Sequence, residues 1–206
     1  MGAVAGGPDG NARVLTPFAD PVQTGRVIAD TQRWLERAVI GLNLCPFAKA
    51  VHVKRQIRYA VTAATDADAL LLEVERELAW LAQASPAATD TTLLIHPCVM
   101  TRFLDHHFFT AEAEAAVRRL GLEGVLQIAS FHPQFTFAGS EPDDVANCTN
   151  RAPYPILHLL RESSIDRAVA AFPDAADIYE RNIATLRRLG HEGWRRLWLD
   201  EPADGD

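Results

Sequence analysis

The 206-residue chain has few cysteines and no long apolar run. Its thiols, Cys45, Cys98 and Cys148, are odd in number and far apart, so reduced cysteines are expected and a disulfide framework is not. No stretch approaches the roughly 18 apolar residues that a membrane span needs. Residues 1–12 have no cationic start and no apolar segment, which predicts a flexible leader instead of a signal peptide. These absences together predict a soluble, cytoplasmic protein.

Positive charge is also scarce, because 20 Lys and Arg residues stand against 27 Asp and Glu residues, with a formal net charge of −7. An acidic surface repels phosphate backbones, so nucleic acid is not expected as a partner. A local basic pocket for a small anion is compatible with this charge. The signatures GxGxxG, GxxxxGK[ST] and GxSxG do not occur, so no cofactor is indicated. The thiols and histidines lack a closed four-ligand pattern, and no structural zinc is expected.

Apolar periodicity predicts one α/β domain over residues 24–190, with a flexible leader over 1–23 and a short tail over 191–206. Strands are expected at 57–62, 91–95 and 124–129, with 136–138 as a fourth. Helices are expected at 24–43, 66–84, 99–105, 110–120, 164–171 and 174–189, and from Tyr154 onward. Strand–helix–strand units favour parallel pairing with right-handed crossovers. The expected fold is a small, mostly parallel three- or four-stranded sheet covered by helices, with an extra C-terminal helical segment.

Two histidines follow successive strands, and each precedes a proline. His96 follows the second strand in the sequence His96-Pro97, and His132 follows the third in Ser130-Phe131-His132-Pro133. Ligands bind beyond the carboxyl ends of strands in open α/β sheets, so both rings are expected on one rim, with their centres about 4–10 Å apart. Imidazole titrates near neutral pH and suits general acid and base roles. The alternative is that both side chains only bond nearby backbone groups.

The segment 130–153 has no regular pattern, and a long irregular segment inside a domain is more often functional than idle. Arg151 lies near its end, just before the helix expected from Tyr154. A helix N-terminus offers unpaired N–H groups, and a guanidinium binds carboxylate or phosphate through two donors, so a small-anion site is predicted here. In the alternative, Arg151 pairs with Asp143 or Asp144 and pins the loop.

Other candidates flank these sites. His158, Arg161 and Glu162 have the spacing of one helical face, which would border the site together with Asn150, or form a solvated edge. Cys45 follows the first helix, whose C-terminal dipole raises a thiol pKa, so it becomes a nucleophile only beside a histidine or arginine. A buried structural thiol is the alternative. His106 and His107 fall in an expected helix break and are expected to be exposed.

Several of these stretches together resemble one known family. They are Arg33-Trp34-Leu35-Glu36-Arg37-Ala38-Val39-Ile40-Gly41-Leu42-Asn43-Leu44-Cys45-Pro46-Phe47-Ala48, His96-Pro97, Ser130-Phe131-His132-Pro133, Asn150-Arg151-Ala152-Pro153-Tyr154-Pro155 and His158-Leu159-Leu160-Arg161-Glu162. Over about residues 24–190 the chain resembles the domain-of-unknown-function family numbered 1415. The resemblance implies a shared fold and a shared site, and it implies no catalytic role for any residue.

The first functional hypothesis is an enzyme, a hydrolase or group transferase, that acts on a small anionic metabolite. His96 and His132 would be its acid and base, Cys45 a conditional nucleophile, and Arg151 part of the anion site. The second is a metal-dependent enzyme with both histidines as ligands and Asp144 or Cys45 as a third. The last is a non-catalytic binding module for a small molecule. Substrate, cofactor and oligomeric state stay open.

Overall fold

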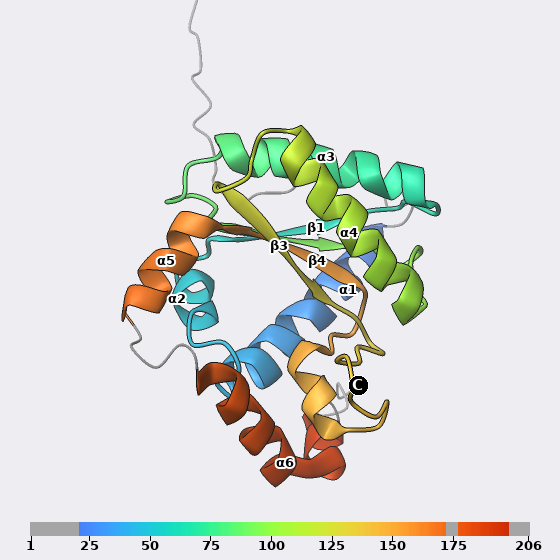
Figure 1. Cartoon of the computed structure of the whole chain (residues 1–206), viewed down its shortest axis with the longest axis vertical. Helices are drawn as coiled ribbons and strands as arrows, with labels where there is room; N and C mark the ends of the chain where they lie inside the picture. The colour runs from blue at the N-terminus through green and yellow to red at the C-terminus, as the bar shows by residue number, and fades with distance from the viewer. Residues whose placement is uncertain (1–20, 172–176, 198–206) are drawn as a thin grey trace, which may run out of the picture.

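The computed structural model describes residues 21–171 and 177–197, which fold around one four-stranded sheet (Figure 1). The elements in chain order are α1 (Pro21–Trp34), the π-helix η1 (Leu35–Ile40), α2 (Ala48–Val53), β1 (Ile57–Val61), α3 (Ala67–Gln83), β2 (Thr91–Ile95), α4 (Phe103–Arg119), β3 (Leu126–Phe131), the 3-10 helix η2 (Val145–Asn150), β4 (Ile156–Arg161), α5 (Glu162–Ala171) and α6 (Ile178–Arg196). Among these helices, none is long and apolar enough to cross a membrane.

The strand order is β1-β2-β4-β3, so the mixed α/β class and a four-stranded sheet are confirmed. The expectation of mostly parallel pairing is wrong, because only β1 and β2 are parallel and β4 runs antiparallel to both β2 and β3. The parallel pair is the one joined by a helix, α3. Since β2 and β3 each oppose β4, they still point in the same direction, and their carboxyl ends meet at one edge of the sheet.

The fourth strand occupies residues that the sequence pattern assigns to a helix starting near Tyr154. Leu157 of β4 pairs with Leu94 of β2 on one side and with Ser130 of β3 on the other. A short apolar run is compatible with either a buried helix or a central strand, and only its two partner strands decide. The proposed strand at 136–138 is absent from the described sheet, and that segment belongs to the loop after β3.

Side chains alternate between two covered faces of the sheet. Leu94 and Leu157 face α3 and α4 and belong to a core with the apolar stripe of α3, including Leu70, Val74 and Leu78. Neighbouring positions face the opposite side and pack against α1 and η1 in a second core that contains Trp34, Leu35, Leu93, Ile95 and Ile156. Figure 1 shows α3 and α4 on one side of the sheet and α1 and α6 on the other. This alternation determines which side of the carboxyl edge each following residue reaches.

Most of the expected helices are confirmed, with two corrections and one addition. The first expected helix corresponds to α1 followed by η1, and α3 lies within the expected 66–84. The expected break at 105–110 is wrong, because α4 is continuous through His106, which packs inward. The helix α2 has no counterpart in the predictions. In α6, Gly190 has φ 68° and interrupts the helix, as its stop signal predicts, but helical residues resume as far as Arg196.

Parts of the predicted leader and tail, residues 1–20 and 198–206, lie outside the described residues. The described portion of the leader, from Pro21, already belongs to α1, and the tail begins inside α6. Trp194 and Leu197 pack against the core on the α1 side of the sheet.

Candidate functional site

Three histidines form a stack of rings at the carboxyl edge of the sheet, on the α4 side. The ring of His106 lies 5.2 Å from that of His96, at an interplanar angle of 26°, and 5.3 Å from that of His132. His96 and His132 therefore meet at one edge as expected, although β4 lies between their strands and His106 lies between their rings. All three residues, here called the histidine stack, are fully buried. The expectation that His106 is exposed is wrong, whereas His107 is exposed.

The outer two histidines of the stack hold the loop between β2 and α4. Nδ1 of His96 lies 3.0 Å from the Val99 carbonyl oxygen, and Nε2 of His132 lies 3.3 Å from that of Met100. Because a carbonyl only accepts, both nitrogens must carry hydrogen, and Nδ1 of His132 accepts from the Gln134 N–H. Met100 has φ 53°, a strained conformation for a residue other than glycine. The stack thus fixes a strained turn at a strand end.

Three nitrogens of the stack have no hydrogen-bond partner within the described residues: Nε2 of His96 and both ring nitrogens of His106. Burial strongly disfavours the charged ring, and it lowers the pKa of His96 to about 4 and that of His106 to about 3. The pKa of His132 is lowered by the same cause. At neutral pH the stack is therefore uncharged, and none of its rings touches solvent.

A cleft of ≈ 420 Å³ lies at the same edge on the α1 side of the sheet. Its lining residues, which define the arginine cleft, are Asp30, Arg33, Pro133, Arg151, Ala152, Pro153 and Trp194. Asp30 is held at its rim, because its carboxylate accepts from Arg33 at 3.1 Å and from the Tyr154 hydroxyl at 2.8 Å. The indole of Trp34 donates to the Arg151 carbonyl at 2.8 Å and ties α1 to this segment.

Arg151 lines this cleft but does not sit at a helix start, because β4 and not a helix follows it. Its guanidinium donates to the carbonyls of Phe135, at 3.2 Å, and Pro142, at 2.5 Å. These bonds pin the long loop, as the alternative held, through backbone carbonyls and not through the aspartates. Asp144 instead caps η2 by accepting from the Ala146 N–H. Arg151 and Arg33 both line the arginine cleft.

Asn150 and Cys45 have structural contacts. The Asn150 side-chain amide donates to the Ser130 carbonyl at 3.2 Å, and the Asn150 backbone carbonyl accepts from the His132 backbone N–H. Cys45 is partly buried against the α1-side core, and burial raises its pKa above the usual thiol value, which opposes a nucleophilic role. The structure places Cys45 neither in the histidine stack nor in the arginine cleft.

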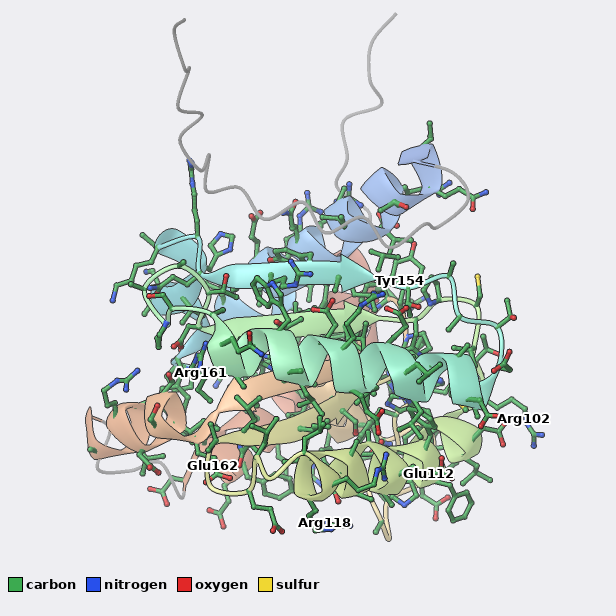
Figure 2. The ribbon with its side chains drawn as sticks, turned by 90° about the horizontal axis from the view of Figure 1, so that it is seen from above. Arg102, Glu112, Arg118, Tyr154, Arg161 and Glu162 are labelled. Atoms are coloured by element: carbon green, nitrogen blue, oxygen red, sulfur yellow. The ribbon has the colours of Figure 1, made fainter. Side chains whose placement is uncertain are left out.

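His158, Arg161 and Glu162 do not share a helical face. His158 lies within β4, where its Nε2 is 2.7 Å from the Thr91 hydroxyl, and burial lowers its pKa to about 4. Arg161 donates to the carbonyls of Leu81 and Ala84 at the end of α3. Figure 2 shows Arg161 and Glu162 at the end of the sheet opposite to Tyr154. The prediction that these three residues share one helical face is therefore wrong.

No three histidines, cysteines or carboxylates among the described residues converge as a metal site. In the histidine stack the rings lie at interplanar angles of 26° and 32°, and Nδ1 of His96 is engaged by the Val99 carbonyl. Both nitrogens of His132 already bond backbone groups, and Asp144 caps a helix. The proposed ligand set of two histidines with Asp144 or Cys45 is not assembled in this arrangement.

Sequence reasoning missed the central ring of the stack and one wall of the arginine cleft. His106 is the fourth residue of α4. Its burial was not predicted, because two adjacent histidines suggest exposure. Arg33 and Asp30 share one face of α1 at a spacing of three, which is a readable signal for a pair. Trp194 comes from the far end of the chain, and no local pattern connects it to Arg33.

Comparisons with known proteins give one family. The family described as "Protein of unknown function (DUF1415)" matches residues 26–196. The match therefore includes the histidine stack and every residue that lines the arginine cleft. No curated protein and no solved structure matches the chain.

Proposed function

The chain belongs to DUF1415, a family without a known activity, and we propose from its geometry that it binds a small organic anion in the arginine cleft. The observation that carries the proposal is that Arg33 and Arg151, which are 118 positions apart, line the same cleft. Asp30, the single carboxylate among the described lining residues, is already engaged by Arg33 and Tyr154. The cleft therefore offers a net positive charge on a chain that is negative overall.

The rest of the lining favours an anion that has an apolar body. Pro133, Ala152 and Pro153 are apolar, and Trp194 supplies a flat ring. An aromatic or other planar carboxylate would place its charge beside the guanidinium groups and its body against these side chains. The cleft also lies beyond the carboxyl end of β3, where ligands of open α/β sheets are commonly bound.

Among the functional classes, a binding module is best supported. The candidate acid and base are completely buried and do not line the arginine cleft. An enzyme of hydrolysis or group transfer is the second candidate, favoured by the unpartnered nitrogens of His96 and His106. In that case the loop between β2 and α4 must move before a substrate reaches the rings. Turnover of the bound anion by wild type and its loss in His96→Gln would support this candidate.

The proposal includes a cytoplasmic location and no nucleic-acid partner. All three cysteines are free thiols, as expected of a protein in a reducing compartment. The net charge of −7 opposes binding to a phosphate backbone. The cation pair is therefore proposed to serve a small molecule and not a polyanion.

The test is a thermal-shift titration with benzoate as the probe, because it combines one carboxylate with a planar apolar ring. Wild type should be stabilised, and Arg33→Gln should weaken the apparent affinity by about tenfold or more, as expected for loss of a charge-assisted bond. Arg118→Gln is the control, since Arg118 is an exposed arginine of α4 that does not line the cleft. Equal affinity in both variants, or no stabilisation of wild type, would refute the proposal.

A further inference from the structure

A separate cleft of ≈ 400 Å³ lies at the other end of the α1–η1 helix, where it faces α6. One wall consists of Gly41, Leu42, Asn43 and Pro46. The α6 wall consists of Ile178, Arg181, Asn182, Thr185 and Arg188, whose spacing places them on one side of the helix. We call this the α6 cleft. It shares no lining residue with the arginine cleft.

The first wall has a fixed shape because of how the π-helix ends. A Cβ atom at Gly41 would lie 2.3 Å from the Arg37 carbonyl oxygen, so this tight turn accepts only glycine. Asn43 follows with φ 54°, the left-handed conformation that ends helices, and the Leu44 N–H closes the end by donating to Val39. π-Helices occur frequently at functional sites, and η1 ends at the wall of the α6 cleft.

The two walls are locked to each other by one buried side chain. The Asn182 amide donates to the Leu44 carbonyl at 2.9 Å, and Asn182 is almost fully buried. Leu44 and Leu186 pack in the same small core beneath the cleft. The α6 cleft is therefore a preformed hollow that requires no closure of loops.

The polar groups of this cleft are cationic or neutral, and several have no internal role. Among the described residues, its lining includes Arg181 and Arg188 and no carboxylate. Arg188, Asn43 and Thr185 have side chains without a hydrogen bond or ion pair to any described residue. The adjacent Arg187, in contrast, lies 3.9 Å from Asp144. Because Arg188 forms no ion pair with any described residue, its guanidinium can bind an external anion.

We propose that the α6 cleft is a second anion site and that it binds a small phosphate monoester. Arg188, Arg181 and the Thr185 hydroxyl would donate to the phosphate oxygens, and the Asn43 amide would do the same from the opposite wall. Leu42, Pro46 and Ile178 would contact the organic body of the ester. The helix end contributes about half a negative charge, which two guanidinium groups outweigh. The site does not depend on the arginine cleft.

An NMR titration of the ¹⁵N-labelled chain with inorganic phosphate and with phenyl phosphate tests this site. Both probes should shift the amide signals of Asn43 and Thr185, and phenyl phosphate should bind several-fold more tightly because of the apolar wall. Arg188→Gln should weaken both affinities by about tenfold or more, the usual effect of losing a charge-assisted bond. Arg187→Gln is the matched control on the same helix and should bind like wild type.

Arg33→Gln should leave this binding unchanged, which separates failure of the α6 cleft from failure of the arginine cleft. Arg187 and Arg188 are both exposed, so their variants should fold, and thermal melts of each variant check this. The proposal is wrong if the signals of Asn43 and Thr185 do not move in about 10 mM phosphate, which would reveal even a millimolar site. It is also wrong if Arg188→Gln and Arg187→Gln bind equally well.

Discussion

The two sides of the carboxyl edge use their polar side chains in opposite ways. On the α4 side, the histidine stack is buried and uncharged, and its outer two rings bond backbone carbonyls. On the α1 side, Arg33 and Arg151 border an open cleft of ≈ 420 Å³. The sequence predicts one combined site that contains His96, His132 and Arg151, and it predicts neither His106 nor Arg33 there. The structure separates these residues into an internal support for a loop and the lining of an open cleft.

Alternation along the strands explains the separation. Leu94 faces α4, so His96, two residues on, is directed to the same side. His132 likewise faces α4, whereas the next residue, Pro133, lines the arginine cleft. A strand end therefore delivers successive residues to opposite layers. Location at the same edge does not place two residues in the same site.

The largest expected effect is the loss of stability that acid causes through the histidine stack. An unfolded chain protonates its histidines near pH 6.5, whereas folded His96 and His106 resist protonation until about pH 4 and 3. The unfolded state thus binds more protons in this window, and the free energy of unfolding falls as the pH falls from about 6.5 toward 4. At pH 5 the loss is about 2 kcal/mol for each ring. His132 and His158 add in the same direction.

Urea denaturation at pH 7.5, 6 and 5 measures this loss. The exposed His107 supplies the matched control, since His107→Gln should retain the full dependence on pH. His106→Leu should reduce the proton uptake on unfolding by about one. A stability that is constant between pH 7.5 and 5 would show that the rings are hydrated or protonated in the folded state.

A smaller and opposite effect is expected from His106→Leu at neutral pH. Both ring nitrogens of His106 are buried without a partner, and such groups typically cost about 1–3 kcal/mol each to desolvate. Loss of its ring contacts to His96 and His132 offsets part of the gain. We expect a net stabilisation of about 1 kcal/mol, measured as a higher urea midpoint at pH 7.5. A destabilised variant would indicate that these nitrogens bind a ligand or water in solution.

Local patterns were sufficient for the elements whose environment is simple. The apolar run 91–95 is a strand covered on both faces, and its bounds agree with the sequence reading. An apolar stripe identifies α3 to within a residue, and the structure shows Asp66 as its N-cap. In both elements most apolar residues of the local pattern are buried, so the elements can be recognised without knowledge of a distant partner.

The failures occurred where distant partners decide. Residues 156–161 contain histidine and arginine at helical spacing, but β2 and β3 flank them and supply hydrogen bonds on both sides. His106 is buried because two rings from strand ends receive it. Arg151 pins the loop, but not through Asp143 or Asp144 as the alternative predicted. Its acceptors are the backbone carbonyls of Phe135 and Pro142, which no pattern of side chains reveals. Its role as an anion ligand stays a prediction.

The last prediction concerns Arg151 in the arginine cleft, on the α1 side of the carboxyl edge. Arg151→Ala removes two hydrogen bonds to loop carbonyls, and because the side chain is partly exposed we expect a loss of only about 1 kcal/mol. Benzoate affinity should fall by about tenfold or more, beyond what this small destabilisation explains. Arg151→Lys keeps the charge but not the planar fork, so it should restore part of the affinity and little of the stability. Urea denaturation together with benzoate titration separates the two effects. A variant that loses stability but binds benzoate like wild type would make Arg151 a loop pin alone, and the arginine cleft would then depend on Arg33.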